Sequence, residues 1–147
     1  MNQPLAYIHP NAKIAEDVII EPFSTIAGDV EIGSGTWIGP NVTIMDGARI
    51  GKNCKIYPGA VIAGEPQDLK FEGEKTTCII GDNTTIRECV TVNRGTNASG
   101  STIVGSNCLL MGTVHIAHDC RLGDNIVIAN GCGISGHCEI DDYAVIG

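Results

Sequence analysis

The sequence is poor in aromatic residues, which make up 4% of its 147 positions. Small and β-branched side chains must therefore supply most of the packing, and the 19 glycines suit tight, repeated turns. The longest apolar stretch falls far short of the ~20 residues that cross a bilayer. No basic segment followed by an apolar run marks a signal peptide. These absences predict a single domain with no membrane span and no export signal.

Positive charge is also scarce. The formal net charge is −8, which disfavours nucleic acid or an anionic membrane surface as a partner. An acidic partner protein would need a locally basic patch. The seven cysteines are an odd number and, without an export signal, indicate reduced thiols in a cytoplasmic protein.

What the sequence has in abundance is a six-residue repeat of aliphatic residues. From Ile8 to Ile62, ten consecutive hexad positions are isoleucine, and 21 of the 24 positions from Ile8 to Ile146 are Ile, Val or Leu. A helix would need a period of 3.6 residues and a plain strand a period of two. A period of six fits one face of a triangular coil in which three short strands complete a turn of 18 residues. The sequence therefore predicts an all-β solenoid of roughly seven turns.

A second position of the hexad supports this frame. The residue four after the aliphatic is small or β-branched, and turn-forming pairs such as Gly-Asp and Asp-Asn lie between the two positions. We expect this residue to point inward near each corner of the coil. Six of the seven cysteines occupy it as small apolar fillers that need neither metal nor disulfide: Cys54, Cys78, Cys108, Cys120, Cys132 and Cys138.

Two stretches, about 63–77 and 94–102, interrupt the repeat without losing its phase. They are polar or rich in glycine, so we expect loops that leave the coil at its corners. Loops on a rigid scaffold are common places for sites, and the first, which is longer and carries mixed charges, is the stronger candidate. The repeat stops at Gly147 without a polar or helical cap, so we expect the chain to be part of a longer protein.

Few side chains are candidates for acid–base chemistry, and the most suggestive are His115, His118 and Asp119, with His137 further along. Both His115 and His118 should project outward. Gly136 follows His118 by one 18-residue turn, so its backbone N–H is a candidate oxyanion donor beside the His118 imidazole. Asp119 could hold and polarise that imidazole.

Two other interpretations compete with this one. The histidines could be exposed corner residues without a task. Alternatively, His115, His118 and His137 could be three imidazole ligands of a metal, as in hexapeptide-repeat carbonic anhydrases. Because His115 and His118 lie on different parts of the coil profile, we predict no metal.

Three motifs carry a resemblance to a known family: residues 67–74 (QDLKFEGE), 86–96 (IRECVTVNRGT) and 115–120 (HIAHDC). With the hexads, the chain resembles the UDP-N-acetylglucosamine 3-O-acyltransferases of lipid A biosynthesis over its whole length. The resemblance implies a left-handed parallel β-helix and a homotrimer with sites in clefts between neighbouring β-helices. It also implies a C-terminal helical domain, which these residues do not include.

The activity implied by the resemblance is transfer of an (R)-3-hydroxyacyl group from acyl carrier protein to the 3-hydroxyl of UDP-N-acetylglucosamine. The sugar hydroxyl would attack the thioester directly, without an acyl-enzyme or a cofactor other than the phosphopantetheine of the carrier. His118 matches the general base, Asp119 its assistant and Gly136 the oxyanion donor. The positions that match substrate contacts are Gln67, Asp68, Lys70, His115 and His137, with Asn93 where many members have histidine.

Other functions stay open from the residues alone. One is another enzyme of the same fold, either an acetyl-CoA-dependent sugar acetyltransferase or the later N-acyltransferase of the pathway. The N-acyltransferase family typically has a nucleotide-binding domain before its hexads, so a repeat that begins by residue 8 counts against it, and the acetyltransferases lack the Gln67–Lys70 signature. A non-catalytic β-helix that only binds partners is the alternative from another class.

Overall fold

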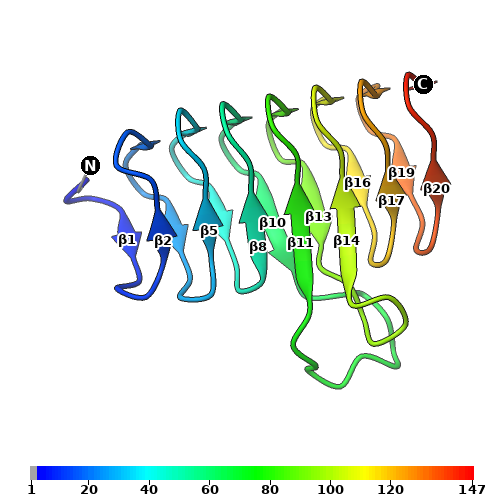
Figure 1. Cartoon of the computed structure of the whole chain (residues 1–147), viewed down its shortest axis with the longest axis horizontal. Helices are drawn as coiled ribbons and strands as arrows, with labels where there is room; N and C mark the ends of the chain where they lie inside the picture. The colour runs from blue at the N-terminus through cyan, green and yellow to red at the C-terminus, as the bar shows by residue number, and fades with distance from the viewer. Residues whose placement is uncertain (1–2) are drawn as a thin grey trace.

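The protein is a three-sided solenoid in the computed structural model, which describes residues 3–147 (Figure 1). These residues contain 21 strands that form three parallel sheets of seven strands each. Each strand from β1 to β18 pairs with the strand three places further along the chain, so three consecutive strands make one coil. The predicted fold, a left-handed parallel β-helix, is confirmed.

Each sheet forms one face of the solenoid. The first face contains β1 (Tyr7–Ile8), β4 (Thr25–Ile26), β7 (Thr43–Ile44), β10 (Val61–Gly64), β13 (Thr91–Asn93), β16 (His115–Ile116) and β19 (Gly133–Ile134). The second face contains β2 (Lys13–Ile14), β5 (Glu31–Ile32), β8 (Ala48–Ile50), β11 (Thr77–Ile80), β14 (Ser101–Val104), β17 (Arg121–Leu122) and β20 (Glu139–Ile140). The third face contains β3 (Ile19–Ile20), β6 (Trp37–Ile38), β9 (Lys55–Ile56), β12 (Thr85–Ile86), β15 (Leu109–Leu110), β18 (Val127–Ile128) and β21 (Val145–Ile146).

The core is the column of hexad aliphatics inside the coils. Register places each one on its equivalent in the next coil, as Ile8 on Ile26, and most are almost fully buried. Burying one such side chain stabilises the fold by about 1.5–3 kcal/mol. The cysteines follow the frame as predicted: Cys54, Cys78, Cys108 and Cys120 are buried, Cys132 and Cys138 are half-buried, Cys89 is exposed, and all seven are free thiols.

The loops are whole hexads inserted into the coil. The three frame positions that are not Ile, Val or Leu are Asp68, Glu74 and Ala98, and all three lie in the loops. Two inserted hexads make the first loop and one makes the second, so the strands that follow keep their phase. The loops span 65–76 and 94–100, shorter than predicted, because β10 pairs with β13 as far as Gly64 and β11 pairs with β14 from Thr77.

Both loops leave the same edge of the solenoid, between the first and second faces (Figure 1). We call this edge the loop corner; it comprises residues 9–12, 27–30, 45–47, 65–76, 94–100, 117–120 and 135–138. His118, Asp119, Gly136 and His137 lie on it as well. The fold thus brings both loops and most of the candidate residues to one edge.

A left-handed backbone conformation recurs in the corners, at the third residue after the inward aliphatic. Asparagine and glycine fill many of these positions, such as Asn41 with a φ of 55° and Gly35 with a φ of 75°. At the loop corner two candidate residues occupy them, Asp119 with a φ of 62° and His137 with a φ of 64°. Asp and His are among the non-glycine residues enriched in this conformation, so the corner accepts them at modest cost.

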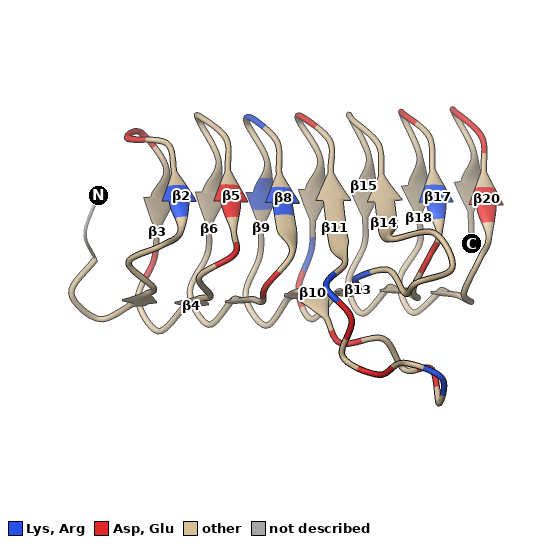
Figure 2. Cartoon of the chain, turned by 60° about the horizontal axis from the view of Figure 1, so that its bottom comes forward, with Lys and Arg blue, Asp and Glu red and all other residues tan. Residues whose placement is uncertain are grey.

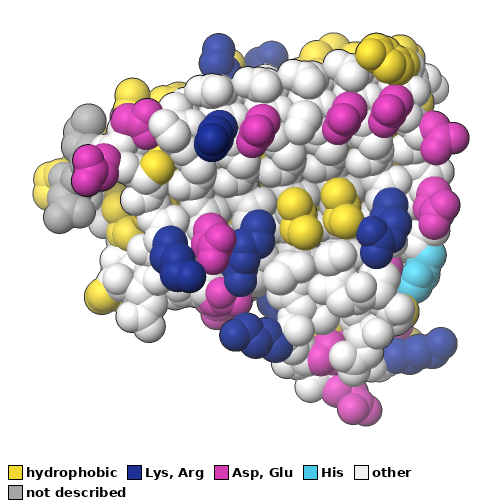
Figure 3. Space-filling model, in the orientation of Figure 1, with side chains coloured by type: hydrophobic (Ala, Val, Ile, Leu, Met, Phe, Trp, Pro, Cys, Tyr) yellow, Lys and Arg dark blue, Asp and Glu magenta, His cyan; other side chains and the backbone are white. Residues whose placement is uncertain are grey.

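The outward side of the second face changes along the solenoid. Charged residues point outward near both ends of this face: in β2, β5 and β8 toward the N-terminus, and in β17 and β20 toward the C-terminus (Figure 2). Between them β11 and β14 present Ile79 and Ile103, and the space-filling view shows hydrophobic side chains flanked by charged ones there (Figure 3). Among residues 3–147 no helix has the length and apolar character needed to cross a membrane.

Candidate active site

The centre of the candidate site is a hydrogen bond between His118 and Asp119. Both follow β16 at the loop corner, and His118 Nδ1 lies 2.8 Å from Asp119 Oδ2. Asp119 has a left-handed backbone conformation, with a φ of 62°. The side chain of His118 is 14% exposed and that of Asp119 is fully buried. The histidine is therefore reachable while its partner is shielded from water.

Hydrogen bonds hold Asp119 as a carboxylate. Oδ1 accepts from Thr96 N at 3.0 Å and from Ser99 Oγ at 2.5 Å, and Oδ2 accepts from Thr96 Oγ1 at 2.6 Å as well as from His118. Burial alone would raise the pKa of Asp119, but the hydrogen bonds from Ser99, Thr96 and His118 together outweigh it and hold the pKa well below its usual range.

The ionised carboxylate fixes the tautomer of His118. A carboxylate can only accept hydrogen bonds, so the neutral imidazole must carry its proton on Nδ1. Its Nε2 then has a free lone pair, which is the state that a general base requires.

Gly136 lies against that nitrogen. A Cβ added to Gly136 would meet His118 Cε1 at 2.7 Å and Nε2 at 2.8 Å, so only glycine leaves room for the ring. Among residues 3–147 the backbone N–H of Gly136 has no backbone acceptor. Gly136, which follows His118 by one 18-residue turn, therefore lies beside it as predicted, and its backbone N–H is an available donor next to the candidate base.

The other two candidate histidines, His115 and His137, have different surroundings from His118. His137 is 57% exposed, packs edge-on against His118 with ring centroids 5.1 Å apart, and has Nε2 3.9 Å from Asp119 Oδ2. His115 lies on the outer side of the first face, where its Nδ1 is 2.7 Å from Thr91 Oγ1. Burial lowers the pKa of His115. His137 therefore lies beside the His118–Asp119 pair, whereas the hydrogen-bond partner of His115 is Thr91.

The three-histidine metal set is not assembled. The cluster with potential ligand atoms within 4.8 Å of one another, among the described residues, is His118, Asp119 and His137. His115 is not part of it. Asp119 already accepts four hydrogen bonds, which fill the positions that a cation would need. We therefore interpret the cluster as a hydrogen-bond network.

The candidate residues of the first loop take no part in this network of hydrogen bonds. Gln67 and Lys70 are exposed, and Asp68 holds a turn by accepting from Lys70 N at 3.0 Å. No hydrogen bond or ion pair within the part of the chain that the structure describes joins them to His118. Asn93 is buried at the base of this loop, where its side-chain amide donates to the carbonyl of Glu65. Its predicted substrate contact stays a prediction.

Sequence reasoning missed Thr96 and Ser99. The second loop was the weaker candidate because it is shorter than the first and lacks its mixed charges. Its hydroxyl groups nevertheless provide two of the hydrogen bonds to Asp119. The only signal was the presence of hydroxyl residues in the inserted hexad, which does not say where they point.

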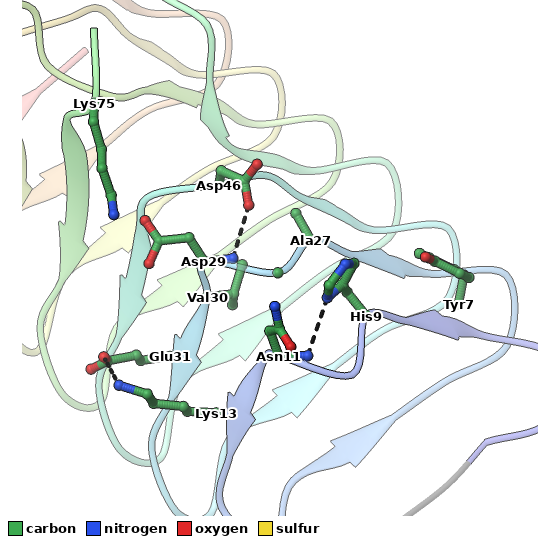
Figure 4. Close-up of a pocket in the computed structure, with 11 residues that line it drawn as sticks. Tyr7, His9, Asn11, Lys13, Ala27, Asp29, Val30, Glu31, Asp46 and Lys75 are labelled. Carbon is green, nitrogen blue, oxygen red and sulfur yellow. Dashed lines mark hydrogen bonds and ion pairs between the residues drawn. The ribbon is translucent and has the colours of Figure 1, made fainter.

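A second histidine environment lies at the other end of the loop corner (Figure 4). It is an open pocket of about 640 Å³ around His9. Most of its polar groups have partners: Lys13 pairs with Glu31 at 3.3 Å, and Asp46 accepts from Asp29 N at 2.9 Å. His9 Nδ1 accepts from Asn11 N at 3.1 Å. With its groups engaged in this way, the pocket is a weaker candidate than the His118 site.

The chain is similar in sequence to a known family of bacterial proteins. Residues 29–64 and 101–136 match the bacterial transferase hexapeptide (six repeats) family. Over 89 residues, 60% of this chain and 34% of the relative, it is 55% identical to the acyl-[acyl-carrier-protein]–UDP-N-acetylglucosamine O-acyltransferase of Aliarcobacter butzleri. It is 67% identical to the protein of that name from Chlorobium phaeobacteroides over 61 residues, 42% of this chain and 23% of the relative.

Solved structures agree. A UDP-N-acetylglucosamine acyltransferase from Bacteroides fragilis superposes with a TM-score of 0.97 at 53% identity, over 99% of this chain and 57% of that one. The Arabidopsis enzyme superposes with a TM-score of 0.79 at 33% identity, over 99% of this chain and 58% of that one. The chain thus spans little more than half the length of these structures. It belongs to the hexapeptide-repeat transferases and, within them, to the group of the UDP-N-acetylglucosamine acyltransferases.

Proposed function

We propose that this chain forms the catalytic β-helix of an enzyme that transfers an (R)-3-hydroxyacyl group from acyl carrier protein to the 3-hydroxyl of UDP-N-acetylglucosamine. The observation that carries the proposal is the pair of His118 and Asp119 with the Gly136 backbone beside His118 Nε2. One group can take a proton, one can orient it, and one can stabilise an oxyanion. Direct acyl transfer needs these three parts.

The proposed reaction uses these three groups in turn. His118 Nε2 takes the proton of the sugar hydroxyl as its oxygen attacks the thioester carbonyl carbon. The carbonyl oxygen gains negative charge and accepts the Gly136 N–H. The tetrahedral intermediate then collapses, the C–S bond breaks, and the imidazolium returns its proton to the departing phosphopantetheine thiolate. Asp119 stays ionised throughout and stabilises the imidazolium.

The exposed first loop suggests where the nucleotide binds. The first loop projects from the solenoid (Figure 1), and it carries the exposed side chains of Gln67 and Lys70 and the half-buried side chain of Asp68. We propose that these residues, with His115, His137 and Asn93, contact the nucleotide sugar in a cleft between neighbouring copies of a homotrimer. Such a cleft would explain why the candidate residues of the first loop take no part in the His118 network within one chain.

The remaining requirements are modest. The base and the oxyanion donor both belong to the chain, so the reaction needs no resident cofactor. The donor is the phosphopantetheine thioester of the carrier. Seven free thiols suit the reducing cytoplasm, where we place the reaction.

An acyl-transfer assay tests the proposal on the complete product of the gene. Purified protein is mixed with UDP-N-acetylglucosamine or its 3-amino analogue and a panel of (R)-3-hydroxyacyl carrier proteins, with acetyl-CoA as a competing donor. We expect an acylated sugar nucleotide from at least one carrier, and a rate about 1,000-fold lower for His118→Ala.

His9→Ala is the matched control, because His9 also lies at the loop corner, and it should retain the wild-type rate. Product from acetyl-CoA alone would instead identify a sugar acetyltransferase. Absence of product from every carrier, or an undiminished His118→Ala variant, would refute the proposed function.

A further inference from the structure

The second loop is a tight structure that lies directly against the catalytic pair. Residues 94–100 leave the first face after β13 and return to the second face at β14. The loop closes on itself through Gly100 N, which donates to Thr96 O at 2.7 Å. A Cβ at Gly95 would lie 2.3 Å from Ser101 N, so glycine is needed where the two ends of the loop meet. The loop is therefore held in one shape by its own backbone.

Its two hydroxyl groups are directed at Asp119. Thr96 Oγ1 accepts from Ala98 N at 3.2 Å, which leaves its own hydrogen for Asp119 Oδ2 at 2.6 Å. Ser99 Oγ has one hydrogen and two acceptors in reach, Asp119 Oδ1 at 2.5 Å and Ser101 O at 2.9 Å. The carboxylate is both nearer and charged, so it is the stronger acceptor.

The opposite side of the loop is joined to the first loop. Asn97 N donates to Glu74 Oε1 at 3.1 Å, and Thr76 Oγ1 donates to Gly95 O at 2.5 Å. The guanidinium of Arg94 also packs over the ring of Phe71, 5.1 Å from its centroid. The second loop thus connects the proposed nucleotide-binding loop to the catalytic pair.

We propose that Thr96 and Ser99 are positioning residues of the active site, which hold the Asp119 carboxylate so that it keeps His118 in the orientation and tautomer of a general base. The assignment rests on the proposed function for the role of His118. Neither residue touches the reacting atoms. Each acts through Asp119, and their two hydroxyl groups donate to different oxygens of its carboxylate.

The test uses the Ser99→Ala and Thr96→Val variants, singly and combined. Both remove a hydroxyl group with little change in size. Ser99→Thr and Thr96→Ser restore a hydroxyl and serve as the conservative variants. Ser106→Ala is the matched control, because Ser106 Oγ accepts from Asp82 N at 3.0 Å in a corner away from the site.

In the acyl-transfer assay we expect kcat of the double variant to fall about 10- to 100-fold through loss of orientation, with an unchanged KM for the nucleotide sugar. Ser99→Thr and Thr96→Ser should recover most of the rate, and Ser106→Ala should lose none.

A second measurement does not depend on turnover. With only four histidines in the chain, selective ¹⁵N-histidine labelling gives a simple imidazole NMR spectrum. We expect a slowly exchanging Nδ1 proton on His118 in the wild type and in Ser106→Ala, and rapid exchange of that proton in the double variant.

The two measurements separate the possible failures. A wild type without acyl transfer but with the expected NMR difference would refute the proposed function and leave the positioning role standing. A double variant with wild-type kcat and a protected Nδ1 proton would overturn the positioning role. An equal loss of rate in Ser106→Ala would assign the effect to general destabilisation and would overturn it as well.

Discussion

Two histidines at the loop corner have closely similar settings. His9, near the N-terminal end, and His118, five coils further along, each lie against a glycine of the next coil. A Cβ at Gly28 would lie 2.9 Å from His9 Nδ1, and a Cβ at Gly136 would lie 2.8 Å from His118 Nε2. Close packing on glycine is therefore not enough to identify an active site.

The two histidines differ in the partner of Nδ1. In His9 this atom accepts a hydrogen bond from Asn11 N, so its lone pair is occupied, and the next residue is Pro10 (Figure 4). In His118 it donates to the carboxylate of the next residue, Asp119, which leaves the Nε2 lone pair free beside a glycine N–H. The comparison teaches that the carboxylate makes the base, by deciding which nitrogen keeps its proton.

Asp119→Asn should remove this difference most completely. Asparagine tolerates the left-handed conformation at this position, so the backbone is not strained. Without the carboxylate the tautomer of His118 is no longer fixed, and we expect kcat to fall by about 100- to 1,000-fold while unfolding stays cooperative. Steady-state kinetics and thermal unfolding measure the two effects. The control is Asp17→Asn, which alters the exposed pair of Asp17 and Ser34 and should keep the rate. A rate within threefold of the wild type would show that the carboxylate is not what distinguishes the two histidines.

Gly136→Ala and Gly28→Ala test whether the close packing matters only at His118. Each added methyl group meets an imidazole, so each should cost a similar amount of thermal stability. Displacement of His118 should also lower kcat about 100-fold, whereas displacement of His9 should not change it. Gly133→Ala, where a Cβ has open space, is the neutral control for both. Equal rates in the two histidine-facing variants would argue against the Gly136 contact.

The stability of the protein in acid should report the Asp119 network. Folding lowers the pKa of Asp119 below its usual value of 3.8. The ionised carboxylate therefore stabilises the fold above pH 3.8, and this contribution is lost as the pH falls further. The difference in unfolding free energy between wild type and Asp119→Asn should be constant from pH 8 to about 5 and shrink below about 4. Denaturant unfolding at several pH values measures it.

The smallest expected effect is that of His115 on the pH dependence of stability. Its sign is opposite to that of a histidine that gains a carboxylate partner on folding. Burial lowers its pKa below 6.5, so the unfolded chain takes up a proton at a higher pH than the folded one. Stability should therefore decrease as pH falls through the mid-6 range. His115→Gln should flatten this part of the stability curve, as measured by urea unfolding. An unaltered slope would show that burial does not disfavour the charged imidazole.

Much of the molecule follows from the hexad pattern. The aliphatic positions predict three faces, 21 strands and the inward cysteines, because each hexad carries the same local information and stacks on its equivalent in the next coil. The same arithmetic predicts that Gly136 meets His118, because no loop interrupts the coil between them. The adjacent Asp119 was predicted as the partner of His118 on the basis of its position in the chain.

The contacts of the loops do not follow the 18-residue period. Thr96 and Ser99 lie 23 and 20 residues before Asp119, separations that are not multiples of an 18-residue turn. They reach the carboxylate because an inserted hexad folds back over the following coil. The backbone path of that hexad is set by its own glycines and by bonds to the first loop, and neither is part of the repeat. The turn that places Asp68 and Lys70 at an exposed tip has the same origin.

The sequence by itself determined the coil, the phase that survives both insertions and the pairing of His118 with the glycine one turn on. These features depend on period and neighbourhood, which a linear pattern contains. Only the tertiary structure decided that the second loop would close over Asp119 and hold its charge. That outcome depends on how two irregular segments pack against the same corner, where the hydrogen-bonding needs of a buried carboxylate select the hydroxyl groups within reach.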